Sequence, residues 1–229
     1  SQGSLNNHFG VPLSLARLPE RVEYGIFELG MNRAGELTRL SQMVRPFVAI
    51  VTTVEPAHLE FFDSVNDIAR AKAEIFDGLE PGGSAVLNRD NAYFGILAAA
   101  ARHAGAEILT FGAHTECDFR LSECALRANG STVHMACEGK VISYSLNVPG
   151  QHWVQNSLAI MAALSALGVD LYEAAQAIAE VSQLPGRGRS HRIQTTDFDF
   201  ELIDDSYNAS PVSVAAAFAV LHGKRATIP

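Results

Sequence analysis

Apolar runs rich in β-branched residues alternate, in the first half of the chain, with segments whose apolar residues recur at helical spacing. The strand-like runs are VEYGIFEL (22–29), FVAIVTT (47–53), SAVLN (84–88) and EILTFG (107–112). The helix-like segments among them cover 35–44, 64–79 and 92–104. Such alternation is typical of a parallel sheet covered by helices. We therefore predict an α/β fold with a mostly parallel sheet.

The pattern changes at residue 118, because several strand-like runs then follow one another without a helix. They cover 118–128, 131–137 and 140–148, and Asn129-Gly130 between the first two is a typical hairpin turn. We predict a small antiparallel sheet over 118–148, placed beside the main one. Farther on we expect helices over 155–167, 170–182 and 210–223, and a strand pair over 191–196 and 199–204.

Composition excludes several classes of protein. The net charge of −8 leaves no basic surface to neutralise nucleic-acid phosphates. Charges or glycines interrupt every apolar stretch before it reaches the roughly 18 residues that a membrane span needs. The cysteines, Cys117, Cys124 and Cys137, match no zinc spacing, and their odd number fits a reducing cytoplasm.

Lys72 lies in the middle of the apolar face of the expected helix 64–79. The face is formed by Val65, Ile68, Ala69, Ile75, Phe76 and Leu79, at a period of 3.6 residues. A lysine there must extend its amine to solvent, find a partner or lose its charge. A neutral amine can add carbon dioxide, and the resulting carbamate is an anionic oxygen ligand suited to magnesium. Both the solvent-exposed lysine and the carbamate remain open at this point.

Glu28 and His58 follow two of the expected strands and are candidate partners for such a site. Glu28 ends the run 22–29, and His58 lies in the loop after 47–53. Ligands of open parallel sheets bind at the carboxyl ends of the strands. Taken alone, Glu28 is explained as a solvated strand end and His58 as a loop histidine. The two together with Lys72 predict a metal site.

Six runs of the chain resemble the Mur ligases, the ATP-dependent amide ligases that build the peptide of bacterial cell-wall precursors. In chain order they are SLNNHFGVPLSL, ELGMNRAGEL, EPAHLEFF, ARAKAEIF, LPGRGR and DDSYNASP. The runs DDSYNASP and NNHFGVP are most similar to those of the member that adds D-alanyl-D-alanine to UDP-N-acetylmuramoyl-tripeptide. The resemblance covers nearly the whole chain.

This resemblance implies a P-loop-NTPase-like central domain and a cytoplasmic, monomeric ligase that uses ATP and Mg²⁺. ATP would phosphorylate the terminal carboxylate of the precursor, and the incoming amine would displace phosphate from the acyl phosphate. Magnesium would neutralise charge on the transferring phosphoryl group. The products serve peptidoglycan synthesis and hence cell shape and division.

The resemblance also implies roles for individual residues. Glu28 and His58 match magnesium ligands, and Lys72 matches a carbamylated lysine. Asn6, Asn7 and Asn32 lie in segments that resemble the muramoyl-peptide side of the site.

The implied nucleotide site draws on the second half of the chain. Asn156 matches an asparagine near the nucleotide, and Arg187, with Arg189 as the alternative, matches an arginine that faces the phosphates. Asp205 matches an aspartate that binds the ribose, as an acceptor-only carboxylate can. Tyr207 and Asn208 continue that motif beside the nucleotide.

Two features depart from the family pattern. No G-x-x-x-x-G-K-[ST] phosphate loop is present, and at QHWVQN (151–156) Trp153 replaces the first asparagine of the usual His-Asn-x-x-Asn. The tryptophan ring remains suited to packing against an adenine. We expect residues 1–209 to be the central ATP-binding domain without its phosphate loop, and 210–229 to begin a carboxy-terminal domain. The chain alone is therefore expected to be inactive.

Other classes of protein remain as alternatives. A binuclear metal hydrolase also uses a carbamylated lysine, but it commonly needs a His-x-His pair, which is absent here. Another Mur ligase, or a folylpolyglutamate-type ligase, would share the fold and chemistry. A non-catalytic nucleotide-binding module would have lost the phosphate loop altogether.

Overall fold

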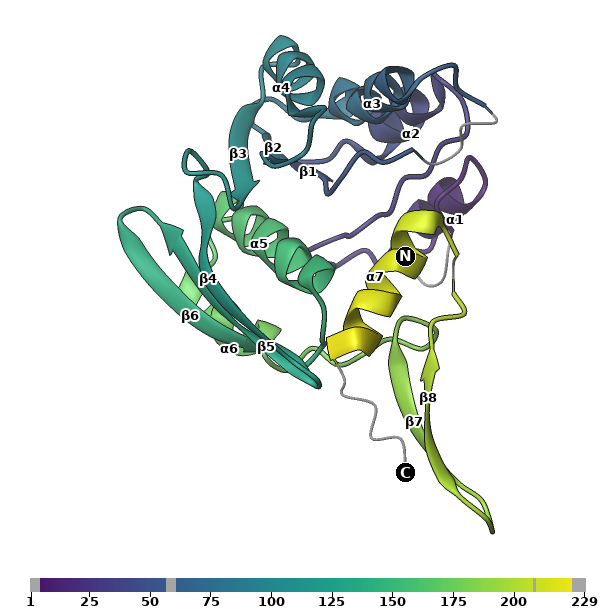
Figure 1. Ribbon diagram of the computed structural model, residues 1–229. Coiled ribbons are helices and arrows are strands. Elements are labelled where there is room, and N and C mark those ends of the chain that lie inside the picture. The colour runs from purple at the N-terminus through teal and green to yellow at the C-terminus, as the bar shows by residue number, and fades with distance from the viewer. Residues whose placement is uncertain (1–4, 57–60, 208, 224–229) are drawn as a thin grey trace.

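The computed structural model describes residues 5–56, 61–207 and 209–223, and the main body is built on a six-stranded sheet (Figure 1). The strands run in spatial order β1 (Val48–Val51), β2 (Ser84–Asn88), β3 (Glu107–Gly112), β4 (Phe119–Arg127), β5 (Gly130–Cys137) and β6 (Lys140–Leu146). Neighbours from β1 to β4 are parallel, and those from β4 to β6 are antiparallel. The α/β prediction with a mostly parallel sheet is confirmed.

Helices cover both faces of the parallel strands. In Figure 1, α2 (Glu36–Val44), α3 (Val65–Ala73) and α4 (Phe94–His103) lie on one side of β1–β3, and α5 (Gln151–Ala166) lies on the other. The remaining helical elements are α1 (Gly10–Ala16), the 3₁₀ turn η1 (Glu74–Gly78), α6 (Leu171–Ile178) and α7 (Pro211–Gly223). No helix of the described residues is long and apolar enough to cross a membrane.

The strand β2 shows how the sequence divides the core between these two faces. Ala85 and Leu87 pack with Ile68 and Leu97 of the helices α3 and α4. Val86, one residue out of phase, belongs to the cluster that includes Leu158 of α5. Alternate side chains of a strand point to opposite faces, and both faces are apolar because helices bury both.

The antiparallel strands over 118–148 are present, but they do not form the separate sheet that we expected. Strand β4 joins β3 through the parallel pairs Phe111–Phe119 and Gly112–Arg120. The six residues between β3 and β4 leave no room for a covering helix. Strand β4 therefore extends the main sheet before it turns into the hairpins.

The strand predicted over 22–29 is absent, which corrects the sequence interpretation. Within the described part of the chain this segment belongs to neither sheet, and Ile26 is 83% exposed. Apolar, β-branched composition favours a strand only where a neighbour supplies hydrogen bonds. Among the described residues, β1 is the outermost strand of the sheet and pairs only with β2.

Other predicted elements are close to those observed. The helix expected over 64–79 has Ser64 as its N-cap, whose side chain accepts a hydrogen bond from the Asp67 amide, but it tightens into η1 from Glu74. The predicted strand pair forms the hairpin of β7 (Arg189–Gln194) and β8 (Asp199–Asp204), which projects from the main body in Figure 1.

Candidate functional site

Backbone hydrogen bonds bring the runs LPGRGR (184–189) and DDSYNASP (204–211) together, although fourteen residues lie between them. The amide of Tyr207 donates to the carbonyl of Gly186 at 3.0 Å, and the amide of Gly188 donates to the Asp204 carbonyl at 2.9 Å. Gly186 has φ +71°, and a Cβ there would lie 3.1 Å from Tyr207. This position therefore requires glycine.

Arg187 lies over the ring of Tyr207. Its guanidinium carbon is 4.0 Å from the ring centroid, a cation–π geometry that holds the arginine in one orientation. Arg187 forms no ion pair with any residue of the described chain, so its N–H groups can bind an anion. The alternative, Arg189, lies exposed at the start of β7.

The two neighbouring aspartates at the end of β8 have different surroundings. One oxygen of Asp204 accepts from the amide and hydroxyl of Ser206, at 3.2 and 2.6 Å, and the other accepts from the Gly186 amide at 3.2 Å. The Ser206 hydroxyl is the main cause that lowers the pKa of Asp204. Asp204 therefore stabilises the turn, whereas Asp205 accepts no hydrogen bond from the described residues.

The first turns of α5 face the same region. Burial lowers the pKa of His152, and the negative charge of Asp205 acts in the opposite direction. Asn156 lies four residues after His152 and therefore on the same face of the helix. Trp153 is partly buried and packs against the main core, which gives its ring a structural contact.

A second group of predicted residues lies near the N-terminus. The side-chain amide of Asn6 donates to Glu28 Oε1 at 3.0 Å, and the Asn6 carbonyl accepts from the Gly30 amide at 2.7 Å. A Cβ at Gly30 would lie 3.0 Å from the Asn6 side chain, so glycine permits this approach. Asn6 thus orients one oxygen of Glu28 and leaves the other available.

Asn7 and Asn32 have local structural contacts. The side-chain oxygen of Asn7 accepts from the amides of Phe9 and Gly10, at 3.0 and 2.9 Å, and so satisfies the amides at the start of α1. The backbone amide of Asn32 donates to Glu36 at 2.8 Å. Their predicted role on the substrate side stays a prediction.

Lys72 lies in the last turn of α3, partly buried between buried alanines. Burial lowers the pKa of its amine, and no described residue forms an ion pair with it. Within the described ranges, no group of three or more His, Cys, Asp and Glu residues is placed to hold a metal ion. The predicted metal ligand His58 lies outside the described residues. Asn208 also lies outside them.

The sequence interpretation missed the turn between β2 and α4, which contains the run N-R-D-N (88–91). Side-chain amides of Asn88 and Asn91 donate to the segment after β1, and the carboxylate of Asp90 accepts from two amides after β3. Its position at the carboxyl end of a strand was a signal that we did not use.

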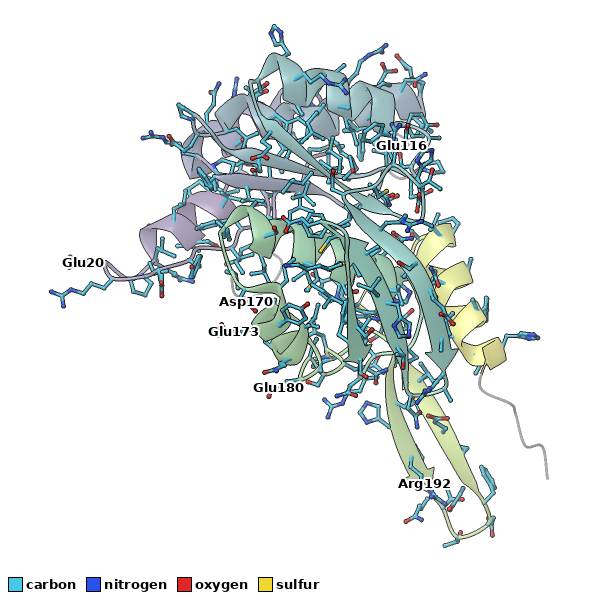
Figure 2. All side chains as sticks on the ribbon, turned by 90° about the vertical axis from the view of Figure 1, so that its left-hand side faces the viewer. Glu20, Glu116, Asp170, Glu173, Glu180 and Arg192 are labelled. Atoms are coloured by element: carbon cyan, nitrogen blue, oxygen red, sulfur yellow. The ribbon has the colours of Figure 1, made fainter. Side chains whose placement is uncertain are left out.

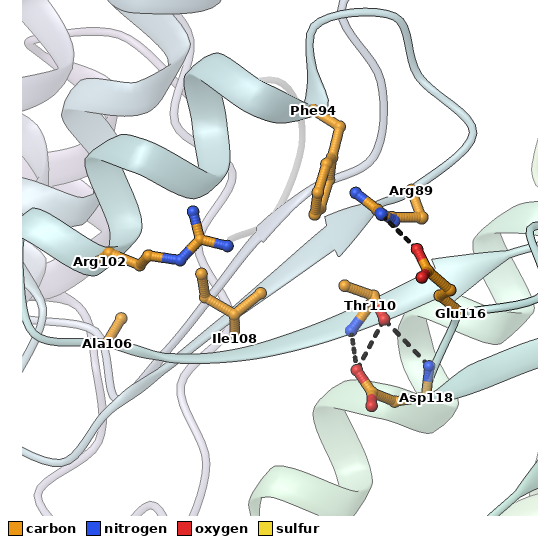
Figure 3. A pocket seen from close by; sticks show the side chains of 8 residues that line it. All are labelled: Arg89, Phe94, Arg102, Ala106, Ile108, Thr110, Glu116 and Asp118. Carbon is orange, nitrogen blue, oxygen red and sulfur yellow. Dashed lines mark hydrogen bonds and ion pairs between the residues drawn. The ribbon is translucent and has the colours of Figure 1, made fainter.

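A hollow of about 490 Å³ lies between α4 and β3, and Arg89 of this turn is among the residues that line it (Figure 3). Arg89 pairs there with Glu116 at 2.7 Å, and Asp118 accepts from the Thr110 amide and hydroxyl, at 2.8 and 2.6 Å. None of the predicted site residues lines it. Its polar groups largely satisfy one another, so it is not the predicted site.

The architecture defines a class: an α/β domain with a mostly parallel sheet that helices cover on both faces. The profile of the Mur ligase middle domain matches residues 1–164. The chain therefore belongs to the Mur ligase family.

Individual relatives agree with this assignment. UDP-N-acetylmuramoyl-tripeptide–D-alanyl-D-alanine ligase of Rickettsia prowazekii is 33% identical over 96% of this chain and 49% of its own length. The ligase of the same name from Escherichia coli is 33% identical over 96% of this chain and 48% of its own. A crystal structure of MurF from Acinetobacter baumannii superposes with a TM-score of 0.88 at 32% identity, covering 97% of this chain and 48% of that one. The chain thus spans about half the length of the relatives that it matches.

Proposed function

We propose that the protein containing this chain is an ATP-dependent ligase that joins D-alanyl-D-alanine to UDP-N-acetylmuramoyl-tripeptide in the bacterial cytoplasm. The observation that carries the proposal is the contact between the Gly186-Arg187 segment and the Asp204–Tyr207 turn. This contact joins the segment of Arg187 to the turn that carries Asp205, and neither side chain forms an ion pair within the described part of the chain. A cation and a carboxylate on joined segments suit a nucleotide with phosphates at one end and a ribose at the other. The names of the relatives support the choice of substrates.

In the proposed reaction the γ-phosphoryl group of ATP passes to the terminal carboxylate of the tripeptide. The amine of D-alanyl-D-alanine then forms the amide bond, and phosphate leaves with the former carboxylate oxygen. Arg187 would hold phosphate oxygens, Asp205 would accept from the ribose hydroxyls, and Asn156 and Tyr207 would flank the nucleotide. These groups orient the reactants, which is the main requirement of phosphoryl transfer.

Mg²⁺ would supply positive charge against the phosphates, and Glu28, His58 and a carbamate on Lys72 would hold it. The residues described here fit that group in two respects. Glu28 is oriented by Asn6, and the amine of Lys72 has a lowered pKa and no competing carboxylate partner. The neutral amine would attack carbon dioxide, form an N–C bond and release one proton. The carbamate would turn a cationic side chain into an oxygen ligand.

We also propose that residues 1–209 form the central domain and that 210–229 begin the next one. The range matched by the family profile, 1–164, lies wholly within the first part. The protein is proposed to act as a monomer.

The test uses the longer protein with ATP, Mg²⁺, the tripeptide precursor and D-alanyl-D-alanine, and detects the amide product by mass spectrometry. Arg187→Ala should raise the KM for ATP about tenfold or more, because it removes charged hydrogen bonds. Arg192→Ala is the matched control, since Arg192 pairs with Asp199 on the exposed hairpin. Absence of product with the wild-type protein, or product only with a folate and glutamate, would refute the proposal.

A further inference from the structure

The turn Asn88–Asn91 contacts loops that follow both neighbouring strands. On one side, Asn88 Nδ2 donates to the Thr52 carbonyl at 3.0 Å. Asn91 Nδ2 donates to Thr53 Oγ1 and to the Val54 carbonyl, both at 3.0 Å. These bonds fix the segment after β1, which leads in the sequence towards His58.

On its other side the turn contacts the loop after β3 and the start of α5. Asp90 accepts from the amides of Ala113 and His114, at 2.6 and 2.9 Å, and from Gln155 Nε2 at 3.4 Å. Gln155 precedes Asn156, the candidate nucleotide residue. Gly112 permits this arrangement, because a Cβ there would lie 2.6 Å from the Asp90 carboxylate.

The bonds on the β1 side continue to a further carboxylate. Thr53 Oγ1 accepts from Asn91 and donates to Glu55 Oε1 at 3.0 Å. The neighbouring Val54 is only 2% exposed, so the Asn91 bond to its carbonyl is sheltered from water. Sheltered bonds in series are stronger than isolated exposed ones, and they hold the segment 52–55 in one conformation.

We propose that the turn Asn88–Asn91 is a positioning element that sets the spacing between the segment 52–55 and the first turns of α5. This inference rests on the proposed function, in which the first region leads to a metal ligand and the second holds the nucleotide. Asn91 acts towards the metal side and Asp90 towards the nucleotide side. Neither residue needs to touch substrate for this role.

The substitution Asn91→Asp separates positioning from the local fold. Asn91 Oδ1 accepts from the Tyr93 amide at 3.0 Å, ahead of α4, and aspartate keeps this acceptor while it loses both donors. The matched control is Asn147→Asp, which removes an amide bond to the Ala179 carbonyl and adds the same charge elsewhere. Asn91→Ala serves as a second variant without an added charge.

Hydrogen exchange tests the positioning directly and does not depend on catalysis. Amides of residues 52–55 should exchange faster in Asn91→Asp and Asn91→Ala than in the wild type, while Asn147→Asp leaves them unchanged. Unchanged exchange in both Asn91 variants would overturn the proposal. The exchange measurement tests the positioning role even if the wild-type protein makes no product. Absence of product would refute the proposed function but not the positioning role.

Kinetics of the longer enzyme test the consequence. Both Asn91 variants should raise the Mg²⁺ concentration for half-maximal activity about three- to tenfold, with the KM for ATP at saturating Mg²⁺ little changed. Asp90→Asn should raise the KM for ATP and leave the Mg²⁺ requirement unchanged. Equal losses of kcat in all variants, with both requirements unchanged, would show a general structural role and overturn the proposal.

Discussion

Glu74 links the helix that carries Lys72 to the start of α2, and its removal gives a sharp test of how this region is held. Its Oε1 accepts from the Gly35 amide at 2.7 Å and its Oε2 from the Thr38 amide at 3.3 Å. Gly35 is the N-cap of α2, has φ +85° and offers no side-chain cap of its own. Glu74 therefore replaces the missing cap from another part of the chain.

The expected cost of Glu74→Ala follows from these contacts. Loss of a helix N-cap costs about 0.5–2 kcal/mol. Two amides lose their partner here, and the carboxylate also favours the positive end of the helix dipole, so we expect about 1–2 kcal/mol. For a chain of this size, each kcal/mol lowers Tm by about 2–4 °C. Glu74→Gln keeps one oxygen acceptor without the charge, so its loss of unfolding free energy should be about half that of Glu74→Ala.

Thermal unfolding followed by circular dichroism measures the change, and hydrogen exchange at Gly35 and Thr38 locates it. Glu180→Ala is the control, because Glu180 is exposed on the surface just after α6 (Figure 2) and its side chain makes no hydrogen bond with the described residues. Its Tm should change by less than that of either Glu74 variant. A Glu74→Ala protein with wild-type Tm and unchanged exchange at both amides would refute the reasoning.

Three further outcomes are expected. Burial lowers the pKa of Lys72 below its ordinary value of 10.5. Between the lowered pKa and 10.5 the unfolded chain binds more protons than the folded one, so the wild type gains stability as pH rises through that range. Lys72→Met should therefore raise Tm at pH 7, with the advantage shrinking towards pH 10.5 in parallel thermal scans, and should abolish ligase activity. Gly112→Ala should cost about 1–3 kcal/mol in urea unfolding, since φ is +140° and the new Cβ would meet Asp90. Asp205→Asn should raise the KM for ATP about tenfold without lowering Tm, whereas Asp204→Asn should lower Tm.

The sequence predicted those elements that the spacing of apolar residues along the chain is enough to indicate. Strands β2 and β3 begin and end at the predicted residues. The failure at 22–29 has a different cause, because an apolar run becomes a strand only when another strand pairs with it. Pairing depends on the neighbouring strands of the sheet and cannot be predicted from the run alone.

The same distinction applies to the candidate site. The resemblance assigned Arg187 and Asp205 to one nucleotide site, and the hydrogen bonds at Gly186 join the two segments that carry them. The sequence did not distinguish Asp204, which holds the turn, from Asp205, whose carboxylate is left unbonded by described residues. That difference depends on where the Ser206 hydroxyl and the Gly186 amide point.

Few of the candidate residues are placed by burial. Glu28, Arg187 and Asp205 are exposed, so packing alone cannot fix their side chains. Their positions depend instead on polar contacts, such as the Asn6 amide on Glu28 and the Tyr207 ring under Arg187. Each such contact is worth about 1 kcal/mol and is lost with a single substitution, whereas the core survives it. Substitutions of these supporting residues should therefore reduce activity before they unfold the domain.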